Sequence, residues 1–208
     1  MTRRGTFIVF EGGEGAGKST VLAGVAARLR GDGCEVVETR EPGGTPLGEQ
    51  IRALVLASKA VDDPLAELLL FEAARAHLVA SVVGPALERG AIVLCDRYSA
   101  SSIAYQGSGR GLGRDVVERA NAVATQGIAP DLTLLLDLPV EAGLARRAGA
   151  GEGNHFDRET IDFHERVRAG FLALASEARG GWAVLDATRP FEDVAAAALD
   201  AIRVVMRG

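Results

Sequence analysis

The sequence predicts an α/β fold, a three-layer sandwich in which about five parallel strands lie between helices. Five short, nearly continuous apolar runs recur along the 208 residues, and each run ends in charged or glycine residues. Such runs are typical of parallel strands that are buried on both faces and carry functional loops at their carboxyl ends. Helical stretches lie between the runs, so strands and helices alternate as in a parallel sheet with helical crossovers.

The elements follow one another in a regular order. The predicted strands cover residues 6–12, 34–41, 91–98, 131–138 and 182–187. The predicted helices cover about 18–30, 46–58, 64–89, 114–126, 139–148, 158–179 and 191–206. A glycine-rich break, "RRAGAGEGNHFD" at 146–157, separates two of these helices and predicts a moving loop. Because no repeat or long linker divides the chain, we expect one domain spanning 1–208, with a lid segment at about 146–160.

Composition excludes several function classes. A net charge of -5 argues against a nonspecific nucleic-acid binder, which needs a basic surface. No apolar run approaches the ~18 residues that cross a bilayer, and Glu11 interrupts the short apolar start, which argues against a secretory signal. The two cysteines, Cys34 and Cys95, lack the spacing of a zinc site or a disulfide framework. We therefore expect a cytoplasmic protein with small-molecule partners, and neither a nucleic acid nor a membrane as partner.

The stretch "FEGGEGAGKST" predicts a phosphate-binding loop. Gly12, Gly17, Lys18 and Ser19 match G-x-x-x-x-G-K-[ST], with a strand before the motif and a helix after it. The glycines let backbone N–H groups point inward, and the helix adds its positive end, so the loop can hold phosphates. Lys18 would contact the β- and γ-phosphates, and the Ser19 hydroxyl would bind Mg²⁺. The predicted ATP-binding residues of this loop are Gly12, Gly13, Glu14, Gly15, Ala16, Gly17, Lys18, Ser19 and Thr20.

The loop places the fold in the P-loop NTP hydrolase type and leaves several activities to compare. A GTPase would carry an N-K-x-D motif, but the only asparagines, Asn121 and Asn154, do not precede lysine. The glycine spacing also lacks the G-x-G-x-x-G of a dinucleotide site. A motor or translocating ATPase would need a larger chain with a more basic face. A small-molecule kinase remains.

Over most of its length the chain resembles the bacterial thymidylate kinases. The resemblance rests on "FEGGEGAGKST", "TREPGGT", "FEAAR", "DRYSASSIAYQG", "PDLTLLLDL", the arginine-bearing loop and "DATRP", which occur in this order. It implies a P-loop nucleoside monophosphate kinase that phosphorylates dTMP to dTDP with MgATP, in dTTP biosynthesis, and that forms a homodimer. Two alternatives stay open: another nucleotide or nucleoside kinase of the same fold, and an ATP-binding regulatory module.

Two strand ends are expected to meet the phosphates. Asp96 could hold Mg²⁺ through water and Arg97 could clamp phosphate, although the two could also form a simple ion pair. In the family the corresponding arginine sits between donor and acceptor phosphates. Asp137, which ends the next strand, is the lower-ranked alternative for the metal. The resemblance implies that Arg40, which precedes the turn at Pro42, holds the acceptor monophosphate. It assigns both Arg40 and Pro42 to the substrate site. Alternatively, Arg40 could be a solvated arginine.

The acceptor pocket is expected on the helix that carries Phe71 and Arg75, which lie four residues apart on one face. Periodicity alone favours a core position for Phe71. The resemblance instead implies that thymine stacks on Phe71 and that Arg75 donates to its carbonyl edge. It also implies that Ser101, Tyr105 and Gln106 close the base and sugar pocket, with Tyr105 crowding a ribose 2′-hydroxyl.

The remaining candidates rest on the resemblance. Glu14 matches an acidic position that faces the acceptor sugar's 3′-hydroxyl or the metal shell, and we count it as catalytic with Lys18 and Arg97. Glu11 is assigned to the substrate site, although it could merely end its strand. Arg189, in "DATRP", could stack on the adenine of ATP or point to water.

The lid is where the chain departs from the family pattern. Related enzymes with glycine at the position of Gly15 usually carry phosphoryl-binding arginines in the lid, and in "GNHFDRE" one such slot holds His155. A neutral imidazole offers one donor where a guanidinium offers five and a permanent charge. We therefore expect Arg147, Arg158 or both to act as catalytic residues, and His155 could be an exposed residue without a role.

Overall fold

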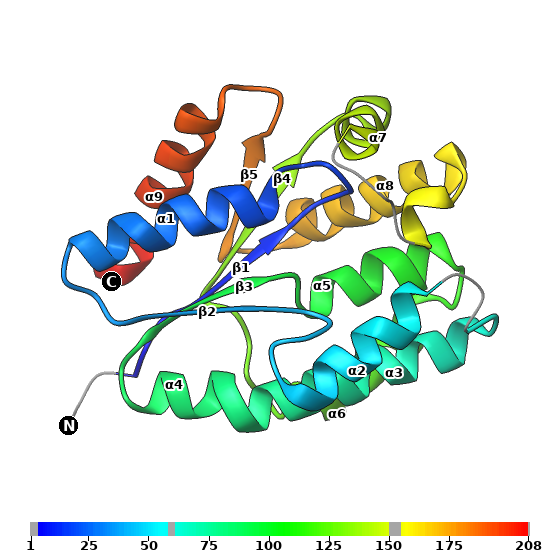
Figure 1. Cartoon of the computed structure of the whole chain (residues 1–208), viewed down its shortest axis with the longest axis horizontal. Helices are drawn as coiled ribbons and strands as arrows, with labels where there is room; N and C mark the ends of the chain where they lie inside the picture. Colours follow the sequence, from blue (N-terminus) through cyan, green and yellow to red (C-terminus); the bar gives the residue numbers. More distant parts are fainter. Residues whose placement is uncertain (1–3, 58–60, 150–154, 208) are drawn as a thin grey trace.

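A five-stranded parallel sheet forms the centre of the computed structural model, which describes residues 4–57, 61–149 and 155–207 (Figure 1). The strands are β1 (Phe7–Glu11), β2 (Val36–Arg40), β3 (Ile92–Asp96), β4 (Leu132–Asp137) and β5 (Trp182–Asp186). Their spatial order is β2-β3-β1-β4-β5, and every neighbouring pair is parallel. The predicted number of strands and their parallel direction are confirmed.

Helices cover both faces of this sheet. They are α1 (Lys18–Gly31), α2 (Pro46–Leu56), α3 (Pro64–Leu78), α4 (Gly84–Glu88), α5 (Ser99–Ser102), α6 (Arg114–Ala124), α7 (Val140–Ala148), α8 (Ile161–Glu177) and α9 (Phe191–Arg207). Wider π-helical turns lie at η1 (Val79–Val83) and η2 (Ile103–Gly109), and a short 3₁₀ turn lies at η3 (Phe156–Arg158). Three of the helices begin at a side-chain cap, in which Thr45, Asp63 and Thr160 accept from the backbone N–H three residues on.

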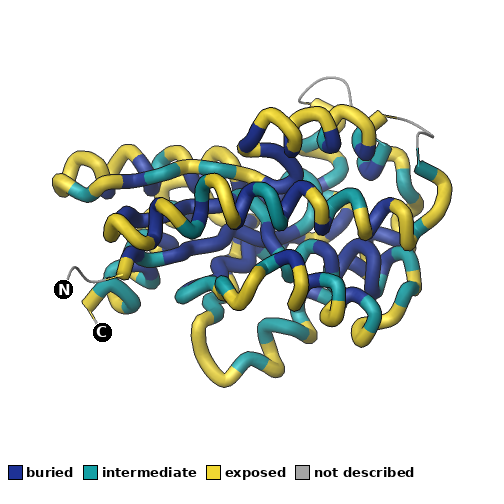
Figure 2. The backbone as a smooth tube through the Cα atoms, turned by 90° about the horizontal axis from the view of Figure 1, so that it is seen from below, coloured by how far each residue is buried: buried dark blue, intermediate teal, exposed yellow. Residues whose placement is uncertain are grey.

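Strand alternation separates two cores, one on each face of the sheet. Ile8 and Phe10 of β1 pack towards α1 and α9, whereas Phe7 and Val9 pack towards the end of α3 and towards α4. Figure 2 shows the buried strands in dark blue between helices whose outer sides are exposed. The predicted three-layer sandwich is therefore confirmed.

Two helical segments differ from the sequence-based expectation. The predicted helix at 64–89 is helical throughout but passes through the wide turn η1 just before Pro85, which has no N–H to donate to the preceding turn. No helix was predicted over 99–109, where α5 and η2 lie. The small polar and glycine residues of "SASSIAYQGSG" show no helical apolar period, and close packing against α8 stabilises the segment instead.

The sheet brings three predicted loops to one edge. Asp96 at the end of β3 pairs with Phe10 of β1 on one side and with Arg40 of β2 on the other. The phosphate-binding loop after β1, the turn after β2 and the turn after β3 therefore leave the sheet side by side. This edge is where a ligand of a parallel α/β sheet is expected to bind.

Part of the predicted lid can be described. Arg147 lies in the last turn of α7, and the chain resumes at His155 before η3. Residues 150–154 of the predicted moving loop lie outside the described residues.

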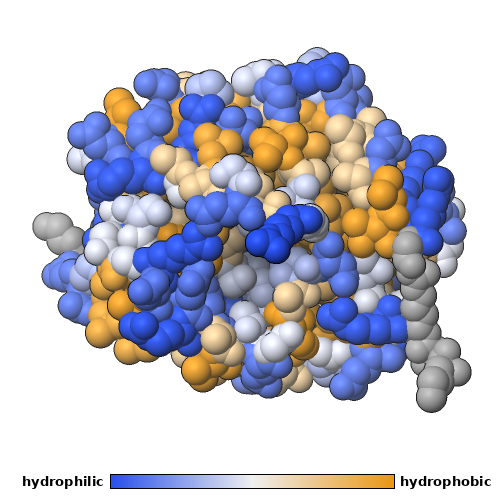
Figure 3. Space-filling model, turned by 180° about the vertical axis from the view of Figure 1, so that it is seen from behind, coloured by the Kyte–Doolittle hydropathy of each residue, from blue (hydrophilic) through white to orange (hydrophobic). Residues whose placement is uncertain are grey.

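No helix in the described part of the chain has the length and apolar character needed to span a bilayer. The face seen in Figure 3 is largely hydrophilic, and its apolar residues form separate small groups.

Candidate active site

The predicted phosphate-binding loop runs close to neighbouring backbone, which explains two of its glycines. At Gly12, φ is 140°, and an added Cβ would lie 2.4 Å from the carbonyl oxygen of Leu136. At Gly15, φ is 68°, and an added Cβ would lie 2.0 Å from the carbonyl oxygen of Gly143 on α7. Only glycine fits these positions, so the loop is fixed against β4 and α7 by its backbone.

Lys18 reaches back across this loop from the start of α1. Its ammonium donates to the carbonyl oxygens of Gly12 at 3.1 Å and Gly13 at 2.8 Å, and the residue is buried. Burial, followed by the charge of Arg97, lowers the pKa of Lys18 to about 8. The lysine is thus held at the loop by carbonyl groups, with its charge beside the predicted phosphate positions.

Ser19 and Asp96 form the predicted metal-binding pair. The Ser19 hydroxyl donates to Oδ2 of Asp96, so the two predicted metal ligands lie together at the sheet edge. The alternative residue, Asp137, uses both carboxylate oxygens to accept from Arg168 of α8, at 2.8 and 2.9 Å. The geometry favours Asp96 over Asp137.

Arg97 connects the phosphate-binding loop with the turn after β3. Nη1 donates to the Gly12 carbonyl at 3.0 Å and to the Ser101 hydroxyl at 3.2 Å, and Nη2 donates to Glu14 at 2.9 Å. The guanidinium carbon lies 4.9 Å from the centre of the Tyr105 ring. Arg97 therefore joins the phosphate-binding loop to Ser101, and its place between donor and acceptor phosphates stays a prediction.

Glu14 faces the same cavity from the loop. Its Oε1 accepts from Arg97 and also from the Tyr105 hydroxyl at 2.8 Å. Burial alone would raise the pKa of Glu14, but the charges of Arg97 and Lys18 outweigh it and hold the pKa at about 2. The carboxylate is therefore ionised at neutral pH.

A cavity next to the loop collects most of the predicted acceptor residues. It holds an empty volume of about 590 Å³, part of which is open to solvent. Eight predicted site residues line it: Glu14, Pro42, Phe71, Arg75, Arg97, Ser101, Tyr105 and Gln106. The structure brings these residues together from the phosphate-binding loop, from α3, from the turn after β2 and from the α5–η2 segment.

Aromatic rings form one part of the cavity wall. The Phe71 ring centre lies 6.2 Å from that of Phe156, which lies 5.7 Å from that of Tyr105. Phe156 comes from the predicted lid segment and was not among the predicted site residues. Flat walls of this kind suit a planar ligand.

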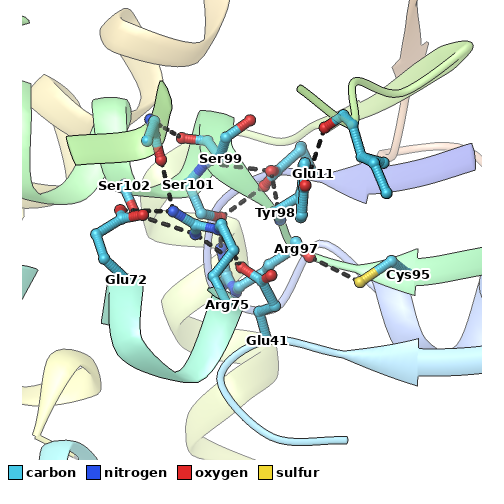
Figure 4. A network of polar contacts seen from close by, with 12 residues as sticks. Glu11, Glu41, Glu72, Arg75, Cys95, Arg97, Tyr98, Ser99, Ser101 and Ser102 are labelled. Carbon is cyan, nitrogen blue, oxygen red and sulfur yellow. Dashed lines mark hydrogen bonds and ion pairs between the residues drawn. The ribbon is translucent and has the colours of Figure 1, made fainter. Parts of the chain in front are cut away.

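Two predicted substrate residues do not line this cavity. Arg40 is half-exposed and pairs with Glu49 at 3.0 Å, in a separate groove beside Ser19 and Asp96. Glu11 is fully buried, and its carboxylate accepts from the turn after β3 (Figure 4). Neither residue therefore lines this cavity, and their predicted contacts with the substrate stay predictions.

A family model described as thymidylate kinase matches residues 10–198. This chain belongs to the thymidylate kinase family. Thymidylate kinase of Thermomicrobium roseum is 53% identical over 202 residues, which cover 97% of this chain and 96% of that relative. Thymidylate kinase of Thermosynechococcus vestitus is 50% identical over 201 residues, which cover 91% and 83%. The crystal structure of thymidylate kinase from Ehrlichia chaffeensis is similar with a TM-score of 0.78 at 30% identity, over 96% of this chain and 99% of that one.

Membership of the thymidylate kinase family confirms the resemblance and disfavours the regulatory-module reading. Six residues that line the cavity were not among the predicted site residues: Glu41, Arg52, Leu56, Tyr98, Ser102 and Phe156. Arg52 of α2 lines the cavity, and its Nη1 donates to the carbonyl of Pro42 at 2.9 Å. Gly48, Ile51, Arg52 and Val55 share the spacing of one helix face, whose other three members are buried. A charged residue on an inward helix face was the signal that could have identified it.

The nucleotide-side candidate Arg189 lies at the surface. It pairs with Asp193 one helical turn along, and about 63% of its side chain is exposed. The loop that contains it is instead joined to α7, because Arg146 donates to the carbonyl of Ala187 at 2.9 Å. The structure therefore favours the solvent-facing reading of Arg189.

The lid candidates face different neighbours. Nε of Arg147 lies 3.2 Å from both carboxylate oxygens of Asp157, which joins α7 to the lid segment. His155 contacts Arg110 through Nε2 at 3.1 Å and lies 3.5 Å from Glu159. Arg158 is exposed. Of the three, His155 has the arrangement of a packing residue.

Proposed function

We propose that this protein phosphorylates dTMP to dTDP with ATP as the phosphoryl donor, as a step in dTTP biosynthesis. The observation that carries the proposal is the cavity walled by Phe71, Tyr105 and Phe156, which opens beside Arg97 and the phosphate-binding loop. A planar base and a sugar phosphate fit a site with a flat apolar wall and a guanidinium among its lining groups. Family membership supports the same activity.

The reaction requires no catalytic base. The acceptor is a phosphate monoester with a second pKa of about 6, so its oxygen is largely ionised at neutral pH. The difficulty is to bring two anions together in line, which positive charge and positioning can provide. Lys18 and the loop N–H groups would hold the donor phosphates, and Arg97 stands where it could contact both donor and acceptor.

The oxygen ligands at the sheet edge fit Mg²⁺. Ser19 and Asp96 supply a hydroxyl and a carboxylate, and Mg²⁺ is commonly held by one or two such groups together with phosphates and water. These two residues would hold the ion, which would offset the charge on the phosphates.

Each part of the cavity has a proposed role. Phe71 would stack on the base, and Gln106 would bind its polar edge together with the Arg75–Ser102 pair. Tyr105, whose hydroxyl bonds Glu14, would limit the space beside the sugar. Arg52 replaces Arg40 as our candidate for the acceptor phosphate, because it lines the cavity and Arg40 does not.

We propose, from the resemblance, that the chain is a single kinase domain with its lid at about 146–160. We also propose that it forms a cytoplasmic homodimer. Exposed leucines on adjacent helices support the dimer. Leu54 of α2 and Leu65 and Leu69 of α3 are each between 44% and 55% exposed. A second copy could cover such a surface.

A phosphate-acceptor screen tests the activity. Purified protein with MgATP is offered dTMP, dUMP, dCMP and thymidine, and ADP formation is measured for each. We expect dTMP to give the highest kcat/KM, and Lys18→Ala, a folded control without the phosphate-binding ammonium, to lose activity by orders of magnitude. Preferred turnover of another acceptor would overturn the proposal that dTMP is the substrate. ATP binding without turnover on any acceptor would overturn the proposal that the protein is a kinase.

A further inference from the structure

Arg97 has a backbone conformation that needs support. Its φ is 71°, in the left-handed region that a residue with a Cβ rarely adopts without compensating contacts. Two contacts hold its own backbone: its N–H donates to the Phe10 carbonyl at 2.9 Å, and its carbonyl accepts from Sγ of Cys95 at 3.0 Å. This conformation turns the guanidinium from β3 towards the phosphate-binding loop.

The side chain of Glu11 holds the residues that follow Arg97. Its Oε1 accepts from the backbone N–H groups of Tyr98 at 2.9 Å and Ser101 at 3.1 Å. Its Oε2 accepts from the Ser101 hydroxyl at 2.6 Å. Three donors from one turn therefore converge on a carboxylate that has no exposed surface (Figure 4).

Ser101 links this carboxylate to the guanidinium. The same Ser101 oxygen that donates to Glu11 accepts from Nη1 of Arg97 at 3.2 Å. A continuous path of hydrogen bonds thus runs from Glu11 through Ser101 to Arg97. Glu11 holds the backbone of the turn that follows Arg97, and the Ser101 side chain orients the guanidinium of Arg97.

We propose that Glu11 is a positioning residue for phosphoryl transfer, which acts by fixing Arg97 in the left-handed turn with its guanidinium at the phosphate-binding loop. The proposal rests on the proposed function, in which Arg97 contacts the phosphates. It replaces the prediction that Glu11 binds substrate, since the Glu11 carboxylate accepts three protein hydrogen bonds and does not line the acceptor cavity.

The role requires a carboxylate. Both of its oxygens accept, as three converging donors demand, whereas an amide of the same size presents an NH₂ group at one of the two positions. In Glu11→Gln this NH₂ group would face either the two backbone N–H groups or the Ser101 hydroxyl. In the first case the turn that follows Arg97 would lose its two backbone contacts, and in the second case the Ser101 hydroxyl would have to turn. In either case the guanidinium of Arg97 would lose part of its fixed orientation.

A double-mutant cycle tests the proposal. We expect Glu11→Gln to lower kcat by about 10- to 100-fold, with KM for ATP and dTMP changed less than about threefold, because misplacement of a transition-state contact costs rate. In the Arg97→Gln background, we expect Glu11→Gln to lower kcat less than about twofold further, because a residue that acts through Arg97 has nothing left to position. Glu118→Gln, which removes an exposed glutamate that pairs with Arg114, is the matched control and should leave kcat unchanged.

Three results would overturn the proposal. First, the kcat losses of Glu11→Gln and Arg97→Gln could multiply in the double variant. Second, Glu11→Gln could raise KM for dTMP with kcat unchanged. Third, a crystal structure of Glu11→Gln could show Arg97 undisturbed. The structure of the variant does not depend on activity. Wild-type turnover of dTMP, measured in the same series, tests the proposed function separately. If Glu11→Gln does not fold, Ser101→Ala breaks the same path with a smaller change and replaces it in the cycle.

Discussion

Arg75 donates from Nε to Oε2 of Glu41 at 2.8 Å, and both side chains are almost completely buried. Its Nη1 donates to Glu72 at 2.6 Å and to Asn121 at 2.5 Å, and its Nη2 donates to the Ser102 hydroxyl at 3.1 Å. Arg75 thus joins α3 to the turn after β2, to α5 and to α6. Its position differs from that of a residue that only reads a base, because most of its donors already have protein acceptors.

We therefore expect Arg75→Leu to destabilise the fold as well as weaken dTMP binding. The substitution leaves Glu41 and Glu72 buried without their cation, and breaking a buried pair in this way costs about 3–5 kcal/mol. Denaturant unfolding measures the loss. Arg52→Leu is the control, since Arg52 lines the same cavity and has no buried acid partner among the described residues. It should raise KM for dTMP at nearly unchanged stability.

A triple variant separates the two contributions of Arg75. Glu41→Gln and Glu72→Gln combined with Arg75→Leu remove the unpaired charges, and we expect this variant to regain about 2 kcal/mol or more of the lost stability. Arg75→Leu with wild-type stability would show that the network does not support the fold.

The same network predicts a pH dependence of stability. Burial raises the pKa of Glu41 to about 7 against the opposing charge of Arg75, while Oε1 of Glu41 has no hydrogen-bond partner among the described residues. Between its unfolded value of 4.5 and about 7 the folded protein holds a proton that the unfolded chain has released. This contribution to stability is fully present below pH 4.5 and is lost as the pH rises through 7, by up to ~3 kcal/mol.

The free energy of unfolding of the metal-free protein, measured at several pH values from 5 to 8, gives the slope of stability against pH. In Glu41→Gln, which cannot titrate, the slope in this window should flatten relative to the wild type. An equal slope in both proteins would assign the proton to another group.

The sequence predicted those features that depend on local pattern. The strands, the phosphate-binding loop and the position of Lys18 follow from apolar runs and from a motif whose residues are neighbours in the chain. The position of Arg52 at the cavity was not predicted, because it depends on how α2 is rotated against the cavity. The partners of Arg75 and Glu11 lie up to 46 and 90 residues away, so their networks arise only when the chain packs.

In the lid, we expect Arg147→Ala to lower kcat at least about a hundredfold with little change in ATP affinity, since removal of one transition-state donor costs ~2.7–4 kcal/mol. His155→Ala should lower kcat by less than about threefold, because Nε2 of His155 contacts Arg110, whereas Arg147 contacts Asp157. Steady-state kinetics measure how much each residue contributes to kcat. They are recorded for the single alanine variants at 147, 155 and 158 and for the triple variant. Normal turnover in all four would show that the lid supplies no catalytic charge and leave transfer to Lys18, Arg97 and Mg²⁺.

Glu67 orients the side-chain amide of Gln106. Nε2 of Gln106 donates to Oε1 of Glu67 at 2.8 Å, and Arg110 donates to both oxygens of the same buried carboxylate. An ionised carboxylate only accepts, so the amide NH₂ must face Glu67, and the amide oxygen is left for the cavity that Gln106 lines.

An acceptor at this position favours a base whose edge carries an N–H, as thymine and uracil do at N3, and disfavours cytosine, whose N3 is itself an acceptor. An unpaired acceptor costs about 1–3 kcal/mol. In Glu67→Gln the residue 67 amide can either donate or accept, so Gln106 can turn its NH₂ group into the cavity. We expect the ratio of kcat/KM for dTMP over dCMP to fall about tenfold or more, mainly through improved use of dCMP. Glu118→Gln, which removes one of two exposed partners of Arg114, is the matched control and should leave the ratio unchanged. A folded Glu67→Gln variant with the wild-type ratio would mean that the orientation of Gln106 does not select the base.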